Sequence, residues 1–187
     1  DGVMSRGLGD VYKRQEYAHR AQKWAENKEN VVVEVYDWDK LNELGMGGLI
    51  NVGKGSDRKP CMVLFTLNPH ADDGVRRPCI VGKGITFDTG GISIKPTSGM
   101  WDMKYDMCGA ATVFGLMEAL YSTGYDRRVN GIACLAENMP DLEHTGLEMY
   151  SRHILEKLWR SSVQTPKAGM FWLMVSARQE NSILNSL

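Results

Sequence analysis

The sequence lacks the features that mark several large classes of protein. No apolar run approaches the roughly 18 residues that cross a bilayer, and residues 1–15 are polar and Gly-rich, unlike a secretory signal. Neither sign of charge is in excess, because 22 Lys and Arg stand against 23 Asp and Glu, for a net charge of −1. This balance argues against nucleic acid and acidic membranes as partners, since both are bound by basic surfaces.

Cysteine is scarce and shows no CxxC spacing. The four cysteines, Cys61, Cys79, Cys108 and Cys134, are scattered along the chain. This usage predicts reduced, buried thiols in a cytoplasmic protein rather than a disulfide framework. The length of 187 residues and the hydrophobic content of 43% predict one soluble domain, or a piece of a larger one.

The first 15 residues differ from the rest of the chain. Residues 5–15 have neither a helical nor an alternating apolar period, and they resemble the in-frame translation of a sequencing adapter. The alternative is a disordered tail. Under both interpretations, residues 1–15 are excluded from the fold.

From residue 16 onward, the hydrophobic pattern predicts alternating helices and strands. The expected helices are 16–28, 39–44 and 107–121, and the expected strands are 31–36, 61–67, 78–82 and 129–135. Strands that alternate with helices at these connection lengths favour right-handed crossovers and parallel pairing. We therefore expect the α/β class, with a central, largely parallel or mixed sheet flanked by helices.

Charged residues gather around a Gly-rich stretch, residues 81–96. Lys83 is expected at a strand end, Asp88 in the following loop, Lys95 seven residues later and Asp106 at the start of a helix. Carboxylate oxygens suit divalent cations, and α/β sheets place their sites at strand ends. Each residue also has a structural alternative: Asp106 as a helix N-cap, Asp88 as a turn cap, and the lysines as solvated side chains. Four such residues within 24 positions favour a site.

A second Gly-rich stretch, Gly48–Gly55, nearly forms a phosphate-binding loop. That loop requires Ser or Thr directly after its Lys, and then a helix. Here Gly55 follows Lys54, and residues 56–60 have the composition of a turn. A nucleotide-binding site remains an alternative, beside a simple Gly-rich connection.

Several ordered motifs resemble the signature of the M17 leucyl aminopeptidases, the cytosol aminopeptidase family that includes the peptidase B branch. The matching segments are Val81–Pro96, Met103–Ala111 and Ala136–Pro140, with Leu44–Gly48 and Val52–Ser56 upstream. The resemblance covers roughly residues 16–140 and implies a part of the family's catalytic domain.

The resemblance implies hydrolysis of an N-terminal peptide bond by a water activated between two divalent ions, Zn or Mn. It implies that Lys83, Asp88 and Asp106 bind metal, Lys83 as a neutral amine and Asp88 as a bridge. It assigns Lys95 to the stabilisation of the tetrahedral gem-diolate. Met103 matches a wall of the pocket for the first side chain of the substrate, with core packing as the alternative. Peptides are the implied substrates, and the intact family forms homo-hexamers.

The next motif of the family is absent from residues 141–187. By the resemblance, it is a Pro-Gly-Asp-Val turn, a strand, and then Thr-Asp-Ala-Glu-Gly-Arg, which supplies the other metal ligands. Codons shifted by one base let Val163–Gly169 encode Thr-Asp-Ala-Glu-Gly-Arg and let Thr145–Tyr150 encode Arg-Pro-Gly-Asp-Val. We therefore expect a single-base frameshift near Pro140 and Asp141. A genuinely divergent C-terminus is the alternative.

The chain is therefore expected to have three parts. Residues 1–15 are a non-native tail, residues 16–140 are the N-terminal part of an aminopeptidase catalytic domain, and residues 141–187 are a frameshifted tail. As written, it is expected to hold one metal ion at most and to be inactive. A catalytically dead binding or assembly module is the other interpretation, and the charge balance argues against DNA as its partner.

Overall fold

The structure, a computed structural model, describes residues 14–71 and 78–140. The elements are α1 (Arg14–Ala25), β1 (Val31–Tyr36), α2 (Trp38–Glu43), α3 (Gly47–Gly53), β2 (Cys61–Leu67), β3 (Cys79–Asp88), the 3₁₀ helix η1 (Met100–Tyr105), α4 (Cys108–Ser122) and β4 (Val129–Asn138). Residues 1–13 of the expected adapter segment and all of the expected frameshifted tail, 141–187, lie outside the described residues.

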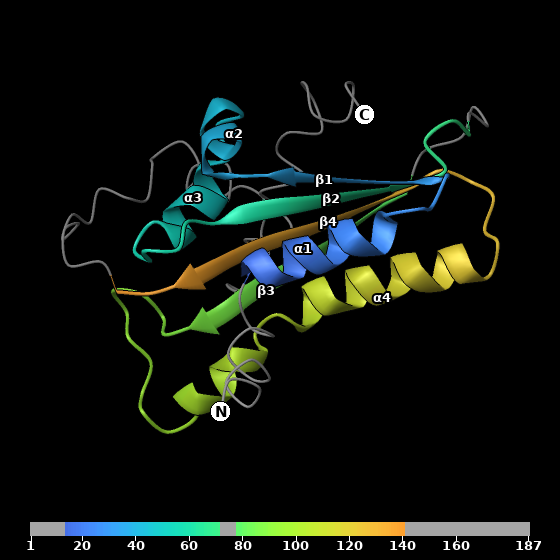
Figure 1. Ribbon diagram of the computed structural model, residues 1–187. Helices are drawn as coiled ribbons and strands as arrows, with labels where there is room; N and C mark the ends of the chain where they lie inside the picture. Colours follow the sequence, from blue (N-terminus) through green and yellow to red (C-terminus); the bar gives the residue numbers. More distant parts are fainter. Residues whose placement is uncertain (1–13, 72–77, 141–187) are drawn as a thin grey trace, which may run out of the picture. The chain divides into compact units, whose positions relative to one another are not determined.

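The four strands form one mixed sheet in the order β1-β2-β4-β3 (Figure 1). The α/β class with flanking helices is confirmed. Parallel pairing holds only between β3 and β4, which are joined through α4, because β2 is antiparallel to both of its neighbours. The carboxyl ends of β1, β3 and β4 therefore lie at the same edge of the sheet, where Figure 1 also shows α2, α3 and η1.

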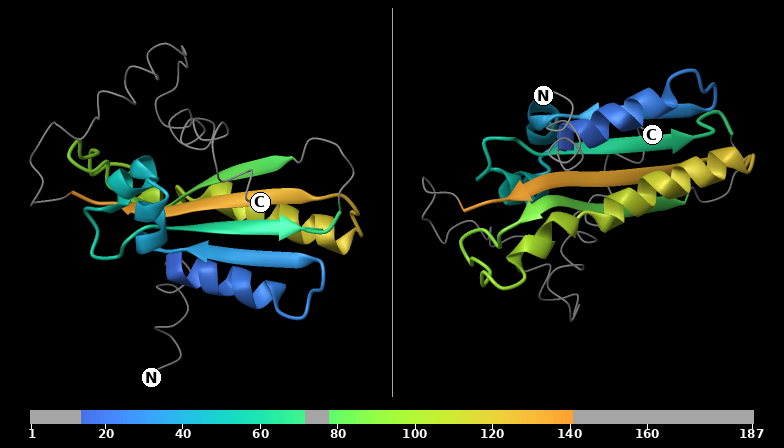
Figure 2. Two further views of the ribbon diagram at one scale, coloured as in Figure 1. Left: turned by 90° about the horizontal axis from the view of Figure 1, so that it is seen from above. Right: turned by 60° about the horizontal axis from the view of Figure 1, so that its bottom comes forward.

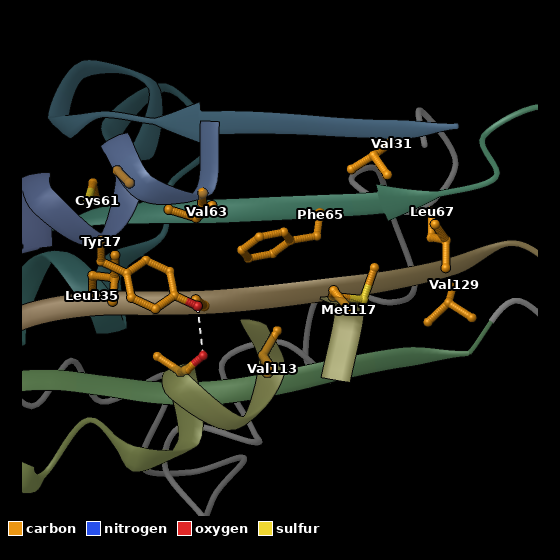
Figure 3. Close-up of a cluster of buried hydrophobic side chains, with 14 residues drawn as sticks. Tyr17, Val31, Cys61, Val63, Phe65, Leu67, Val113, Met117, Val129 and Leu135 are labelled. Carbon is orange, nitrogen blue, oxygen red and sulfur yellow. Dashed lines mark hydrogen bonds between the residues drawn. The ribbon is translucent and has the colours of Figure 1, made fainter. Parts of the chain in front are cut away.

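Helices α1 and α4 pack on the same face of the sheet (Figures 1 and 2). Alternate residues of β2, namely Val63, Phe65 and Leu67, point into this core, as the period of two in a strand requires. Val113 and Met117 of α4 meet them at helical spacing (Figure 3). This core fixes α4, and hence the segment that precedes it, against the sheet.

An aromatic cluster joins α1 to α4. Trp24 and Phe114 meet edge to face with ring centroids 5.6 Å apart, and Phe65 lies 5.4 Å from Phe114. The buried hydroxyl of Tyr17 donates to the carbonyl of Ala110 at 2.7 Å, the dashed line in Figure 3. Since α1 starts at Arg14, it includes the last two residues of the segment that we expected to lie outside the fold.

Some boundaries differ from those that the sequence predicts. Helix α2 begins one residue earlier than expected, after Asp37, whose side chain accepts from the backbone N–H of Lys40 at 3.0 Å. The expected stop at Gly45 is confirmed by its positive φ of 61°. Helix α3 was not predicted. Strand β3 continues to Asp88 and β4 to Asn138, because the two strands pair along this whole length.

Two further properties follow from the described residues. No helix among them has both the length and the apolar content to cross a membrane. All four cysteines are free; Cys61 and Cys134 are buried as expected, whereas Cys79 is half-buried and Cys108 is exposed.

Candidate metal centre

The structure brings the four charged residues predicted from sequence into one cluster. Lys83 and Asp106 form an ion pair with Nζ and Oδ2 2.5 Å apart. Lys95 and Asp88 form a second ion pair, with Nζ also 2.5 Å from Oδ2. The carboxyl groups of Asp88 and Asp106 each shift the pKa of the other, so the two ion pairs interact.

The local positions of these residues differ from the sequence prediction. Lys83 lies inside β3 rather than at its end, and Asp88 is the last residue of the strand rather than part of the loop. Asp106 is not the N-cap of α4; that position belongs to Met107, which makes no side-chain cap hydrogen bond. The N–H of Gly90 donates to Asp88 Oδ1 at 3.0 Å, so Asp88 does cap the following turn as well.

Neither lysine is a solvated surface side chain. The Lys83 side chain is 24% exposed and the Lys95 side chain is 17% exposed, and each forms an ion pair with one carboxylate. The carboxylate of Asp88 is 6% exposed. A buried carboxylate is stable only when charge and hydrogen bonds compensate for lost hydration, and the cluster provides both.

Close backbone packing sets Asp106 against β3. A Cβ atom on Gly109, the second residue of α4, would lie 2.7 Å from the backbone nitrogen of Lys83. The N–H of Ile85 donates to the carbonyl of Asp106 at 3.1 Å. Two contacts between β3 and the start of α4 therefore hold Asp106 beside Lys83.

Sequence reasoning missed Asn138 as a member of the cluster. The side-chain amide of Asn138, at the end of β4, donates from Nδ2 to Asp88 Oδ1 at 2.7 Å. Asn138 belongs to the segment Ala136–Pro140 that carries part of the resemblance, but no local pattern links it to a residue 50 positions earlier. The parallel register, which pairs the two residues, creates the contact.

The two carboxyl groups have opposite pKa shifts. Burial raises the pKa of Asp88, but hydrogen bonds with Lys95, Asp106, Asn138 and the Gly90 N–H outweigh it and hold the pKa well below its usual value. Burial also raises the pKa of Asp106; Lys83 lowers it, and the neighbouring Asp88 raises it, for a net increase. Neighbouring acids whose pKa values are pushed apart are typical of a functional site.

Three groups of the kinds that bind divalent cations lie in this cluster. The described residues contain no group of three or more His, Cys, Asp and Glu side chains arranged for metal binding. The cluster nevertheless places two carboxylates together with the amine of Lys83, and carboxylate oxygens with one nitrogen suit Mn²⁺ or Zn²⁺. The two lysines supply the positive charge that the carboxylates require in this structure.

Met103 lies near the cluster in η1. It is half-buried, and its carbonyl accepts from the Asp106 N–H at 3.3 Å. Met103 is not among the residues of the buried core cluster in the part of the chain that the structure describes. Its place in a substrate pocket stays a prediction.

The second Gly-rich stretch has a different arrangement from a phosphate-binding loop. Residues 47–53 form α3, and Lys54 is its C-cap, whereas a phosphate loop precedes its helix. Ser56 donates from Oγ to Glu137 Oε2 at 2.6 Å, and Arg58 NH1 donates to Glu137 Oε1 at 3.2 Å. In this structure, Ser56 and Arg58 bind the end of β4.

Comparisons with known proteins agree on one family. The family model described as "Cytosol aminopeptidase family, catalytic domain" matches residues 7–147. A probable cytosol aminopeptidase of Azotobacter vinelandii is 47% identical over 124 residues, which cover 66% of this chain and 25% of that protein. The chain therefore spans about a quarter of the length of the curated relatives it matches.

Solved structures match over the same share of the chain. The bottromycin maturation enzyme BotP in complex with Mn is 41% identical, with a TM-score of 0.60, over 68% of this chain and 27% of that one. Leucyl aminopeptidase from Trypanosoma brucei in complex with actinonin is 32% identical, with a TM-score of 0.65, over 72% of this chain and 26% of that one.

Proposed function

The chain belongs to the cytosol aminopeptidase family, and from this premise we propose that the whole protein removes N-terminal residues from peptides with divalent metal ions. The observation that carries the proposal is the cluster of Lys83 and Asp88 of β3, Lys95 of the following loop and Asp106 after η1, joined by two ion pairs. Peptide substrates follow from the peptidase family. The manganese in the BotP structure supports a divalent metal.

Lys83, Asp88 and Asp106 are the residues that would hold a metal ion. A bound divalent cation acidifies water and polarises the scissile carbonyl group. For Lys83 to donate a lone pair, its Nζ must release a proton and leave the ion pair with Asp106. The ammonium of Lys95 must likewise leave Asp88 Oδ2, since each carboxylate is paired with a lysine in the structure.

Lys95 is proposed to act on the substrate rather than on the metal. Its ammonium lies against Asp88, donating to the backbone carbonyl at 3.2 Å as well as to Oδ2. A positive charge in a half-buried site favours negative charge that develops on the carbonyl oxygen. Met103, in the adjacent η1, is proposed to line the pocket for the first side chain of the peptide.

We further propose that residues 141–187 are a shifted frame and that the intact domain continues in another reading frame. The family match ends at residue 147, and the alignment with the Azotobacter relative spans 124 residues. The span 16–140 has nearly the same length. The chain as written then lacks the second set of metal ligands, holds one ion at most, and is inactive. The intact protein is proposed to be cytoplasmic and hexameric, with a leucine-type preference.

Hydrolysis of leucine-p-nitroanilide in the presence of Mn²⁺ or Zn²⁺ tests the proposal. The chain as written should show no turnover, and the protein with its frame restored should show metal-dependent turnover that Asp88→Ala and Lys95→Ala abolish. Robust turnover by the chain as written, lost in Asp88→Ala, would contradict its proposed inactivity. A restored protein that binds Mn²⁺ without turnover would favour a binding or assembly module instead.

A further inference from the structure

Asn138 contacts the charged cluster of Lys83, Asp88, Lys95 and Asp106 through a hydrogen bond that the proposed function does not use. Asp88 and Asn138 are partners in the parallel register of β3 and β4, and each is the last residue of its strand. The Asn138 amide donates to Asp88 Oδ1 at 2.7 Å. Asn138 bears no charge, so it acts through this hydrogen bond, which orients the Asp88 carboxylate and favours its ionised form.

The backbone of Asn138 holds the loop that follows Asp88. The Asn138 carbonyl accepts from the N–H of Thr89 at 3.0 Å and from the Thr89 hydroxyl at 2.6 Å. Gly91 has a positive φ of 66°, and a Cβ there would lie 2.7 Å from Asn138 Oδ1. Gly91 therefore leaves the space that the amide group occupies, and the amide is confined on that side.

The two oxygens of the Asp88 carboxylate have different kinds of partner. Oδ1 accepts from two fixed donors, the Gly90 N–H at 3.0 Å and the Asn138 amide at 2.7 Å. Oδ2 faces Lys95, whose side chain is long and rotatable. Two donors on one oxygen fix the plane of the carboxylate and leave the other oxygen for an exchangeable partner.

The end of β4 is itself anchored on its other side. Glu137, the neighbour of Asn138, accepts hydrogen bonds from Ser56 at 2.6 Å and from Arg58 at 3.2 Å. The Glu137 side chain is 14% exposed. Charge-assisted hydrogen bonds of this kind are stronger than neutral ones, so they restrict the position from which Asn138 reaches Asp88.

We propose that Asn138 is a positioning residue for metal binding: its amide holds Asp88 Oδ1 so that Oδ2 is presented to a divalent cation. The proposal rests on the proposed function, because it takes Asp88 as a metal ligand. Partners that orient ligating carboxylates typically contribute about 10–100-fold to metal affinity. Asn138 acts through Asp88 and does not bind the metal.

The test is a Mn²⁺ titration of the 187-residue chain, followed by the paramagnetic resonance of free Mn²⁺, together with thermal unfolding without metal. Asn138→Ala should weaken Mn²⁺ binding about tenfold or more, and Asp88→Ala should abolish it. Thr86→Val is the matched control, because the buried Thr86 hydroxyl bonds the Ala136 carbonyl between the same two strands, at 3.3 Å. Thr86→Val should lower thermal stability and leave the Mn²⁺ affinity unchanged.

Each other outcome overturns the proposal. Parent-like Mn²⁺ affinity in Asn138→Ala, with binding lost in Asp88→Ala, would remove the role of Asn138 and leave Asp88 as a ligand. Equal weakening in Asn138→Ala and Thr86→Val would show general loosening of the strands. Parent-like binding in Asp88→Ala, or no binding by the parent chain at millimolar Mn²⁺, would remove the ligand on which the role depends. The hydrolysis assay on the frame-restored protein tests the proposed function separately.

Discussion

Gly82 in β3 and Gly109 in α4 are in backbone contact, with no side chain between them. A Cβ on Gly82 would overlap the carbonyl of Gly109 and lie 2.8 Å from the nitrogen of Ala110. A Cβ on Gly109 would lie 2.7 Å from the nitrogen of Lys83. Because backbone atoms on both sides cannot rotate away, this contact sets the distance between β3 and the helix that follows Asp106.

Gly109→Ala should destabilise the chain by about 1–3 kcal/mol, the usual cost of overpacking. Urea denaturation measures this change in the free energy of unfolding. Gly115→Ala is the control in the same helix, because a Cβ there would meet nothing within 4 Å, and it should be neutral or stabilising by up to about 1 kcal/mol. Equal stability of the two variants would show that the contact does not constrain α4.

Ser56→Ala should cost about 1.5–3 kcal/mol of unfolding free energy, since it removes a hydrogen bond to the carboxylate of Glu137. Ser98→Ala, at an exposed position, should change stability by less than about 0.5 kcal/mol. Chemical denaturation of both variants provides the comparison. A Ser56→Ala variant as stable as the parent would mean that the hydrogen bond from Ser56 contributes nothing to folding.

Lys95→Met should tighten Mn²⁺ binding to the chain, because the ammonium of Lys95 competes with the cation for Asp88 Oδ2. Without metal, the same variant should be less stable, since a carboxylate that is 6% exposed loses its charged partner. The rise in melting temperature on addition of Mn²⁺ should therefore exceed that of the parent. Lys104→Met is the control, because Lys104 lies over the rings of Trp101 and Tyr105 and bonds no carboxylate in the described residues. A smaller rise in Lys95→Met than in the parent would argue against competition.

Stability should fall as the pH rises above about 8.5, where thiols of the unfolded chain ionise. Burial raises the pKa of Cys61 to about 11 and that of Cys134 to about 12. From about pH 8.5 up to the folded pKa of each thiol, the folded state keeps a proton that the unfolded state loses. The free energy of unfolding therefore declines over this range by up to about 1.4 kcal/mol per pH unit for each thiol. Denaturation from pH 7 to 10 measures the slope. Double substitution of Cys61 and Cys134 by Ala should flatten it, and an unchanged slope would point to other groups.

The sequence was a good guide to local features and a poor one to contacts across the sheet. The short helix α2, expected at 39–44, and its stop at Gly45 were predictable because their signals are local, although the Asp37 cap was missed. The C-terminal end of β3 was not predictable, since Gly-Lys-Gly has weak strand propensity. Pairing with β4 and close packing of Gly82 against α4 extend the strand regardless.

The candidate site shows the same division. Lys83, Asp88 and Asp106 were identified by residue type and by the family resemblance, but the two ion pairs were not foreseen. The contacts of Asp88 with Asn138 and of Ser56 with Glu137 join residues 50 and 81 positions apart. Such contacts depend on strand order and register, which no periodicity in a single sequence specifies.

The hydrogen bond from the Ile85 N–H to the Asp106 carbonyl has a consequence for self-association. Strand β3 is at the end of the described sheet, and an unpaired N–H on such a strand is a template on which another chain can add. Because the Ile85 N–H already donates to the Asp106 carbonyl, it is not free to pair with the edge of another chain. Substitutions that loosen η1 should therefore reduce the yield of monodisperse protein as well as disturb the cluster.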